Sequence, residues 1–181
     1  FPTYWSMEDW ANFENDTPGQ EIPEEIQKPN YSWNGSSGDV SNAVNNGSFF
    51  LLHRDHGSRV GWGEPYFNVN HVDALTNQDL QPIVWTVNCQ TGWFDNETDA
   101  SAAGTSPAAE SFTEHWMRNS NGGSVGLIAA TRVSYSGFND RLVWGWTDAV
   151  WAGFLNWCNV NQPSHHPIYR MSDVVKYGKL Y

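Results

Sequence analysis

Cysteine is scarce in this chain of 181 residues, which contains only Cys89 and Cys158. Two cysteines are too few for a fold held together by several disulfides, although a single bridge between them stays open as an alternative to separate roles. Long apolar runs are also missing, because no stretch approaches the ~18 residues that a membrane-spanning helix needs. We therefore expect neither a disulfide-rich scaffold nor a transmembrane segment.

Positively charged residues are also scarce. The sequence has 9 Lys and Arg residues against 20 Asp and Glu residues, which gives a net charge of −11. Such a charge would repel nucleic acids and anionic membranes, so neither is expected as the main partner. Apolar residues make up 39% of the chain, but with 11 tryptophans the aromatic share reaches 15%. Aromatic side chains bury large areas, so this length and composition predict one folded domain.

Hydrophobic patterning divides the chain into two parts. Residues 1–38 are rich in polar residues, proline, glycine and tryptophan without a regular period, which predicts an irregular segment. Residues 39–181 alternate between helix-like and strand-like patterns. Apolar runs predict strands at 48–52, 82–88 and 122–131, and helical patterns lie at 39–47, 68–77, 106–119, 139–157 and 171–181, the last capped by Ser172. This order predicts an α/β fold, with a mostly parallel sheet buried between two layers of helices.

Two consecutive predicted strands are each followed by polar residues. In parallel sheets, functional groups gather at these carboxyl ends of the strands. The segment FFLLHRDHGSRVGW, residues 49–62, changes from apolar to polar at its histidines, and Cys89 follows the next strand. Strand ends that are adjacent or one removed lie ~5–10 Å apart, so His56 could activate the Cys89 thiol as a base. The backbone N–H groups of Gly57 and Cys89 could then bind the oxyanion of acyl transfer. This pattern favours nucleophilic catalysis over an inert buried thiol.

Metal chemistry is one alternative. His53, Asp55 and His56 are metal-ligand types within one short run, and His165 and His166 could add further ligands. Side chains alternate along a strand, however, so His53 and His56 are not expected to point the same way. Prolines on both sides of the second histidine pair predict a loop there. Metal catalysis is therefore the weaker interpretation.

Carbohydrate binding is another alternative, because tryptophan is so abundant. Four tryptophans fall in stretches where they could reach the surface, namely Trp5, Trp10, Trp33 and Trp62. Four others share one apolar helical pattern and are expected to fill the core, namely Trp144, Trp146, Trp151 and Trp157.

The segment from Gly47 to Phe94 resembles the catalytic core of gingipain-type cysteine peptidases, which have a caspase-like fold and belong to clan CD. The shared features are an apolar strand before His-Gly-Ser, a nearby tryptophan, Leu-Thr-Asn before the next strand, and a cysteine followed by x-Gly-x-Phe. They occur here as His56-Gly57-Ser58, Trp62, Leu75-Thr76-Asn77, Cys89 and Gly92-Trp93-Phe94. The 33 positions from His56 to Cys89 fit the family without a gap, and the likeness extends over residues 39–181.

The resemblance implies a caspase-like three-layer sandwich in which His56 and Cys89 form the catalytic dyad. It implies the same two oxyanion donors, the N–H groups of Gly57 and Cys89. Residues expected around the substrate are Trp62, Arg132, Ser134 and Tyr135, the last beside the S1 pocket. Asp55 is not expected to assist His56, because strand alternation points it away.

Specificity and cofactors follow from the same resemblance. The family usually cuts after basic residues by means of an upstream carboxylate, for which Glu8 and Asp9 are candidates. An Arg132 that faced the pocket would instead favour an acidic substrate residue. The chemistry requires no cofactor, but family members often bind calcium, and the carboxylates of one loop could form a structural calcium site. These are Asp95, Glu97 and Asp99.

The expected function is a secreted or cell-surface cysteine endopeptidase that hydrolyses peptide bonds through an acyl-enzyme. Its expected partners are a protein or peptide substrate and further segments of the same precursor. A complete caspase-like sheet has more strands than the three predicted here, so residues 39–181 are expected to be the catalytic segment of a larger chain. The alternative is a catalytically silent relative that acts as a secreted adhesion or scaffold module.

Overall fold

The computed structural model describes residues 35–95, 110–153 and 166–180. Several predictions concern residues outside these ranges, namely those on Trp5, Glu8, Asp9, Trp10, Trp33, Glu97, Asp99, Trp157, Cys158 and His165.

The central sheet has three parallel strands in the order β1-β5-β6. Its strands are β1 (Phe50–Arg54), β5 (Ile83–Val87) and β6 (Gly126–Ala129), which correspond to the three predicted apolar runs. β5 lies between the other two strands, and its residues are largely buried. The order makes β1 and β5, the two strands that precede the predicted histidine and cysteine, immediate neighbours.

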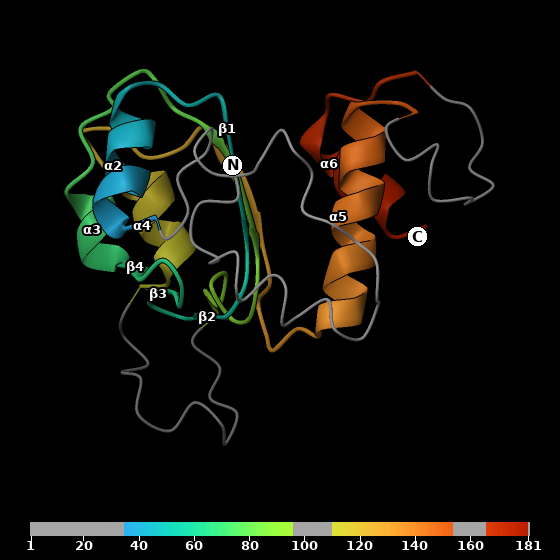
Figure 1. The fold of residues 1–181 in the computed structure, drawn as a ribbon, viewed down its shortest axis with the longest axis horizontal. Helices are drawn as coiled ribbons and strands as arrows, with labels where there is room; N and C mark the ends of the chain where they lie inside the picture. Colours follow the sequence, from blue (N-terminus) through green and yellow to red (C-terminus); the bar gives the residue numbers. More distant parts are fainter. Residues whose placement is uncertain (1–34, 96–109, 154–165, 181) are drawn as a thin grey trace.

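Helices cover both faces of this sheet, which confirms the predicted α/β class (Figure 1). One face carries α2 (Ser37–Asn45), α3 (Val69–Asp73) and α4 (Phe112–Arg118). The other face carries α5 (Ser136–Val150) and α6 (Met171–Gly178). The result is a three-layer arrangement with the sheet in the middle.

Each face of the sheet has its own hydrophobic core, because side chains alternate along β5. One core contains Val44, Trp62, Phe67, Val72, Leu75, Val84, Phe112 and Trp116. The other contains Trp85, Val87, Trp146, Ala149 and Val174. In the first core four aromatic rings lie with centroids 5.3–6.4 Å apart. Aromatic pairs at such separations contribute ~0.5–1.5 kcal/mol each beyond their burial, which explains where much of the aromatic content goes.

A small antiparallel sheet follows β1 and was not predicted. Its strands β2 (Gly57–Ser58), β3 (Gly61–Trp62) and β4 (Phe67–Asn68) have two residues each, too few for any hydrophobic period to be visible. Gly61 has φ of 153°, and a Cβ atom there would collide with the Phe67 carbonyl oxygen. Glycine is therefore required where β3 and β4 approach each other.

Capping boxes set the starts of α2 and α4. Ser36 and Asp39 cap α2, so this helix begins two residues before the predicted range of 39–47. Ser111 and Glu114 cap α4, and the Ser111 N–H donates to the Glu114 carboxylate at 2.6 Å. The prediction that this helix starts near residue 106 is therefore wrong, because the reciprocal cap fixes its start at Phe112.

The last two helices also differ from their predicted ranges. α5 begins at Ser136, earlier than the predicted residue 139, and ends at Val150. α6 begins at Met171 with Arg170 in the cap position, so Ser172 lies inside the helix and is not its cap.

Burial corrects two further expectations. β1 is an edge strand of the described sheet, and Leu52 is 42% exposed, so this strand is not buried on both faces. Trp146 is buried as predicted, whereas Trp144 and Trp151 are 41% and 45% exposed. Trp144 lies beside the stripe of α5 that faces the sheet, and Trp151 follows the last residue of this helix.

None of the helices in the described ranges combines the length and the hydropathy required to cross a bilayer.

Candidate active site

His56 and Cys89 lie at corresponding positions after two neighbouring strands. The parallel register pairs Arg54 with Val87 at the carboxyl ends of β1 and β5. His56 and Cys89 each follow this last pair by two positions, and neighbouring strands are about 4.8 Å apart. The fold therefore brings the predicted histidine and the predicted cysteine to the same edge of the sheet.

The backbone after His56 turns into the small antiparallel sheet. The Gly63 N–H donates to the His56 carbonyl at 2.9 Å, so these two residues form a hydrogen-bonded pair. Bonded and non-bonded pairs alternate in an antiparallel ladder, so Gly57, which faces Trp62, belongs to a non-bonded pair. The Gly57 N–H consequently points away from β3. This orientation leaves it directed outward from the ladder, as an oxyanion donor must be.

Gly57 also packs tightly against Asn88, the residue that precedes Cys89. A Cβ atom at Gly57 would lie 2.6 Å from Cγ and 2.7 Å from Oδ1 of the Asn88 side chain. Asn88 is 1% exposed and is held by several hydrogen bonds, so it cannot move aside easily. Glycine is thus required here by the packing of the two strand ends, and not only by the approach of a substrate.

Replacing Gly57 by alanine is therefore expected to lower the free energy of unfolding by about 1–3 kcal/mol through overpacking. Urea denaturation followed by tryptophan fluorescence measures this change. The matched control is Gly137→Ala, because a Cβ atom at Gly137 in α5 meets nothing within 4 Å. The control should keep or slightly raise stability, by up to about 1 kcal/mol. An equal loss in both variants would contradict the packing argument.

The Cys89 side chain is a partly buried free thiol. Its Sγ donates to the carbonyl oxygen of Ser134 at 3.4 Å. Backbone bonds from Gln90 N–H to the Arg132 carbonyl (3.1 Å) and from Gly92 N–H to the Ala130 carbonyl (2.9 Å) join the loops after β5 and β6. Since β5 is the central strand, Cys89 lies between the β1 side, which carries the histidine, and the loop of residues 130–135.

Loop 130–135 carries Ser134 and Tyr135, two of the residues predicted near the substrate. The Ser134 hydroxyl accepts a hydrogen bond from the Asn139 side chain at 2.9 Å, which anchors the loop to the first turns of α5. Tyr135 is 68% exposed immediately before this helix. Ser134 is thus in contact with Cys89, and the exposed aromatic ring follows it directly in sequence.

Arg132 belongs to the same loop, and its positive charge is paired with a carboxylate. Its guanidinium donates to both Asp95 carboxylate oxygens, at 3.3 and 2.9 Å, and lies 5.3 Å from the centroid of the Trp93 ring. A calcium ion at Asp95 would have to displace this guanidinium, so the described part of the predicted calcium loop does not offer a free carboxylate. The calcium site stays a prediction, because the other two carboxylates lie outside the described residues.

The prediction that Trp62 lies at the surface is wrong. Trp62 is 2% exposed, stacks on the His53 ring at 4.2 Å between centroids, and donates from Nε1 to the Thr86 hydroxyl at 2.8 Å. The antiparallel hairpin folds this side chain down onto the face of β5. Trp62 therefore lies beneath the surface and could support the substrate region only through the residues that cover it.

His53 is buried, with hydrogen bonds at both ring nitrogens. Nε2 lies 2.9 Å from the Glu64 carbonyl oxygen and Nδ1 lies 2.8 Å from the Asn88 amide nitrogen. A carbonyl oxygen only accepts, so Nε2 carries the proton and Nδ1 accepts from Asn88. Burial lowers the pKa of His53 to about 4. Over residues 35–95, 110–153 and 166–180, no group of three or more His, Cys, Asp or Glu side chains could hold a metal ion.

Asn88 was not among the residues singled out in the sequence. Its side chain nevertheless connects His53 to the loop that carries Cys89. Its Oδ1 accepts from the Thr91 hydroxyl at 2.7 Å and from the Thr86 hydroxyl at 3.1 Å. The available signal was its position, because it is an amide at the end of an otherwise apolar strand. Such a residue needs buried polar partners, which a sequence does not identify.

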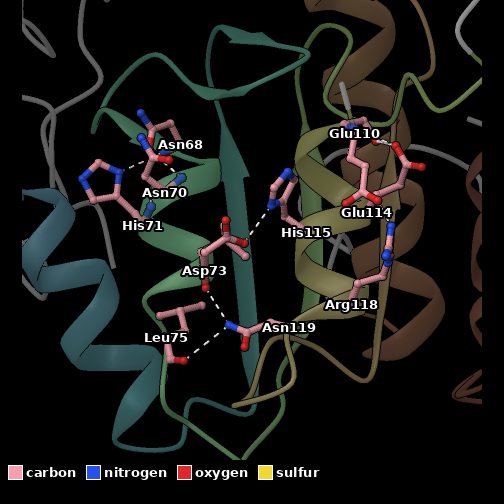
Figure 2. Close-up of polar contacts among 12 residues, drawn as sticks. Asn68, Asn70, His71, Asp73, Leu75, Glu110, Glu114, His115, Arg118 and Asn119 are labelled. Carbon is pink, nitrogen blue, oxygen red and sulfur yellow. Dashed lines mark hydrogen bonds and ion pairs between the residues drawn. The ribbon is translucent and has the colours of Figure 1, made fainter. Parts of the chain in front are cut away.

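A second polar cluster joins α3 and α4 (Figure 2). Asp73, Glu110, His115, Arg118 and Asn119 line a pocket of about 250 Å³. The His115 ring pairs with Asp73 at 2.7 Å, and Arg118 pairs with Glu110. The Asn119 amide donates at 2.7 Å to a carbonyl of α3. These side chains bond to one another within the cluster, so we interpret it as a structural tie between the helices.

Comparisons with known proteins identify the family of this chain. The sequence profile of peptidase family C25 matches residues 4–181. Gingipain R2 of Porphyromonas gingivalis (strain ATCC 33277) is 34% identical over 56 residues, which is 31% of this chain and 8% of that protein. Gingipain R1 of Porphyromonas gingivalis has the same identity over 56 residues, 6% of its length. The matched segment thus spans less than a tenth of each of these two relatives.

Solved structures give the same answer for the fold. Gingipain R (RgpB), described as an Arg-specific cysteine proteinase, superposes with a TM-score of 0.63 at 22% identity, over 83% of this chain and 31% of that one. A complex of the pro- and mature domains of RgpB from Porphyromonas gingivalis superposes with a TM-score of 0.55 at 23% identity, over 66% of this chain and 27% of that chain. The predicted caspase-like fold is confirmed for this part of such a structure. The chain belongs to peptidase family C25.

Proposed function

We propose that this chain carries the catalytic Cys89–His56 pair of a cysteine endopeptidase. The observation that supports this most directly is the register of β1 and β5, in which both residues follow the last strand pair by the same two positions. Membership of a peptidase family supports the same reaction class. The outward-directed N–H of Gly57 supplies one of the two donors that acyl transfer needs.

The proposed reaction uses these groups in sequence. His56 removes the thiol proton, and the Cys89 sulfur attacks the scissile carbonyl to form a tetrahedral intermediate. The N–H groups of Gly57 and Cys89 hold the negative oxygen. His56 then donates its proton to the departing amine as the C–N bond breaks, which leaves an acyl-enzyme. Water attacks this thioester with His56 again as base, releasing the acid and restoring the thiol.

The first test measures the coupling of the two side chains without needing to know the substrate. Dilute iodoacetamide is applied from pH 4 to 9, and alkylation of the Cys89 peptide is followed by mass spectrometry. We expect Cys89 to react below pH 7 and His56→Ala to move the profile upward, toward that of an ordinary thiol near pH 8.5. His115→Ala is the matched control, because His115 pairs with Asp73 in the other cluster, and it should leave the profile unchanged.

Two results would contradict the proposal. An unreactive Cys89, or a Cys89 bridged to Cys158, would remove the nucleophile and favour the scaffold or adhesion alternative. If Cys89 is reactive but its pH profile is the same in His56→Ala as in wild type, His56 is not the base. The Cys158 peptide is quantified separately in the same digest, so the two thiols are not confused.

The setting of this activity is also a proposal. We infer a protein or peptide substrate, a secreted or cell-surface location, and contact with other segments of the same precursor. The net charge of −11 disfavours nucleic acid as a partner. Precursor segments are supported by the similarity to a complex of pro- and mature domains, in which this chain corresponds to 27% of the matched chain. A structural calcium ion remains part of this proposal.

A further inference from the structure

His53 lies at the middle of a buried hydrogen-bond chain beneath the two strand ends. It is the register partner of Thr86, so both side chains lie on the face of the sheet that Trp62 covers. His53 is 3% exposed, Thr86 is 2% exposed and Asn88 is 1% exposed. Buried polar groups of this kind hold a defined geometry when all of them are paired.

The donors and acceptors are fixed at the two ends of this chain. Trp62 Nε1–H only donates, and it donates to the Thr86 hydroxyl. Thr86 and Asn88 bond in both directions, because the Thr86 hydroxyl donates to Asn88 Oδ1 at 3.1 Å and accepts from the Asn88 amide nitrogen at 2.9 Å. The Asn88 amide also donates to His53 Nδ1. His53 Nε2–H donates to the Glu64 carbonyl, which only accepts. His53 is thus a neutral imidazole with a single tautomer.

The two hydrogen-bond partners of His53 adjoin the two loops of the proposed active site. Asn88 immediately precedes Cys89. Glu64 follows Gly63, whose N–H donates to the His56 carbonyl at 2.9 Å. A Cβ atom at Gly63 would lie 3.2 Å from the His56 Cβ, so this turn packs directly against the histidine. A shift of His53 would therefore be transmitted to both loops.

We propose that His53 is a positioning residue that couples two loops of the proposed active site. It bonds through Asn88 to the loop after β5, which carries Cys89, and through Glu64 to the turn that packs against His56. This inference rests on the proposed function. His53 does not touch the substrate. Its imidazole sets the distance between the two strand ends by bonding one loop with each nitrogen. Displacement of a reacting group by about 1 Å can cost on the order of 10²-fold in rate, so a small relaxation here has a measurable effect.

The test compares three variants in the alkylation assay, with folding checked by tryptophan fluorescence and circular dichroism. His53→Phe keeps a flat ring against Trp62 but removes both hydrogen bonds. We expect it to lower the Cys89 alkylation rate at pH 7 by about tenfold and to move the pH profile toward that of His56→Ala. His53→Gln retains one donor and one acceptor and should restore the rate to within about threefold of wild type.

Thr91→Val is the third variant, in case His53→Phe does not fold. Valine is close to threonine in shape, and the change removes one donor to Asn88 Oδ1. It should lower the alkylation rate about threefold with a smaller displacement of the profile. If a folded His53→Phe protein keeps the wild-type profile, the inference is overturned. If His53→Phe does not fold, an unchanged profile in Thr91→Val overturns it.

The proposed function and this inference fail in different ways. If His56→Ala leaves the wild-type profile in place, the catalytic pair itself is refuted. If His56→Ala moves the profile but folded His53→Phe does not, the pair stands and only the positioning role is lost.

Discussion

Replacing Cys89 by alanine is expected to reduce peptide hydrolysis by on the order of 10³-fold or more. The reason is that alanine has no nucleophile, so the acyl-enzyme cannot form and the protein retains only binding and oxyanion contacts. The assay follows the release of new amino termini from a denatured protein substrate, because such a substrate offers every kind of residue at the cleavage position. Cys89→Ser is measured beside it, since a hydroxyl is similar in size but far less ionised at neutral pH.

The matched control for this experiment is Cys158→Ala, which removes the other cysteine of the chain. It should hydrolyse the substrate at the wild-type rate. Activity that survives Cys89→Ala and disappears with a chelator would support the metal-hydrolase alternative. Absence of hydrolysis in the wild-type protein, together with an unreactive thiol, would support the scaffold alternative.

Acidification is expected to destabilise the protein through His53. Burial is the largest cause that lowers the pKa of this side chain from its ordinary value of 6.5 to about 4, and it outweighs the Glu64 carbonyl bond and the Asp55 charge, which raise it. Between these two values the unfolded chain binds a proton that the folded chain does not. Stability is therefore complete above pH 6.5 and falls as the pH decreases toward 4. The loss amounts to about 3 kcal/mol.

Urea unfolding at pH 7, 6, 5 and 4 measures this loss in wild type and in His53→Gln. Glutamine does not titrate, so the difference in unfolding free energy between the two proteins should change by about 3 kcal/mol over this range. Asp39 also has a lowered pKa, because Ser36 donates hydrogen bonds to its carboxylate, and it loses stabilisation in the same direction. It is present in both proteins and cancels in the difference. A difference that stays constant with pH would show that His53 is not a buried neutral imidazole.

The central sheet could be predicted from the sequence for a physical reason, and so could the positions of His56 and Cys89 after two neighbouring strands. Apolar runs of five or more residues identify strands, and the carboxyl ends of parallel strands share one edge. A cysteine and a histidine at such ends are therefore brought together by topology alone. The order β1-β5-β6 makes these two strands neighbours.

The surroundings of the site could not be predicted in the same way. Strands of two residues, such as β2 and β3, have no period, so the hairpin that buries Trp62 was invisible. His53 and Asn88 are 35 positions apart, and their hydrogen bond depends on strand register. From the sequence, the charge of Arg132 could have faced a substrate, but it pairs with Asp95, which lies 37 positions away. Pairings of this kind follow from tertiary structure and not from local pattern.

The groups at the two ends of the hydrogen-bond chain under the proposed active site limit what this chain can do. A proton wire needs an acid at one end and a base at the other, but this chain begins at the Trp62 indole N–H and ends at the Glu64 carbonyl oxygen. Neither group gives up or takes a proton under ordinary conditions. The chain can hold the two loops in place, but it cannot conduct protons between them. Any solvent isotope effect on alkylation or hydrolysis should therefore arise at the Cys89 thiol, His56 and water alone.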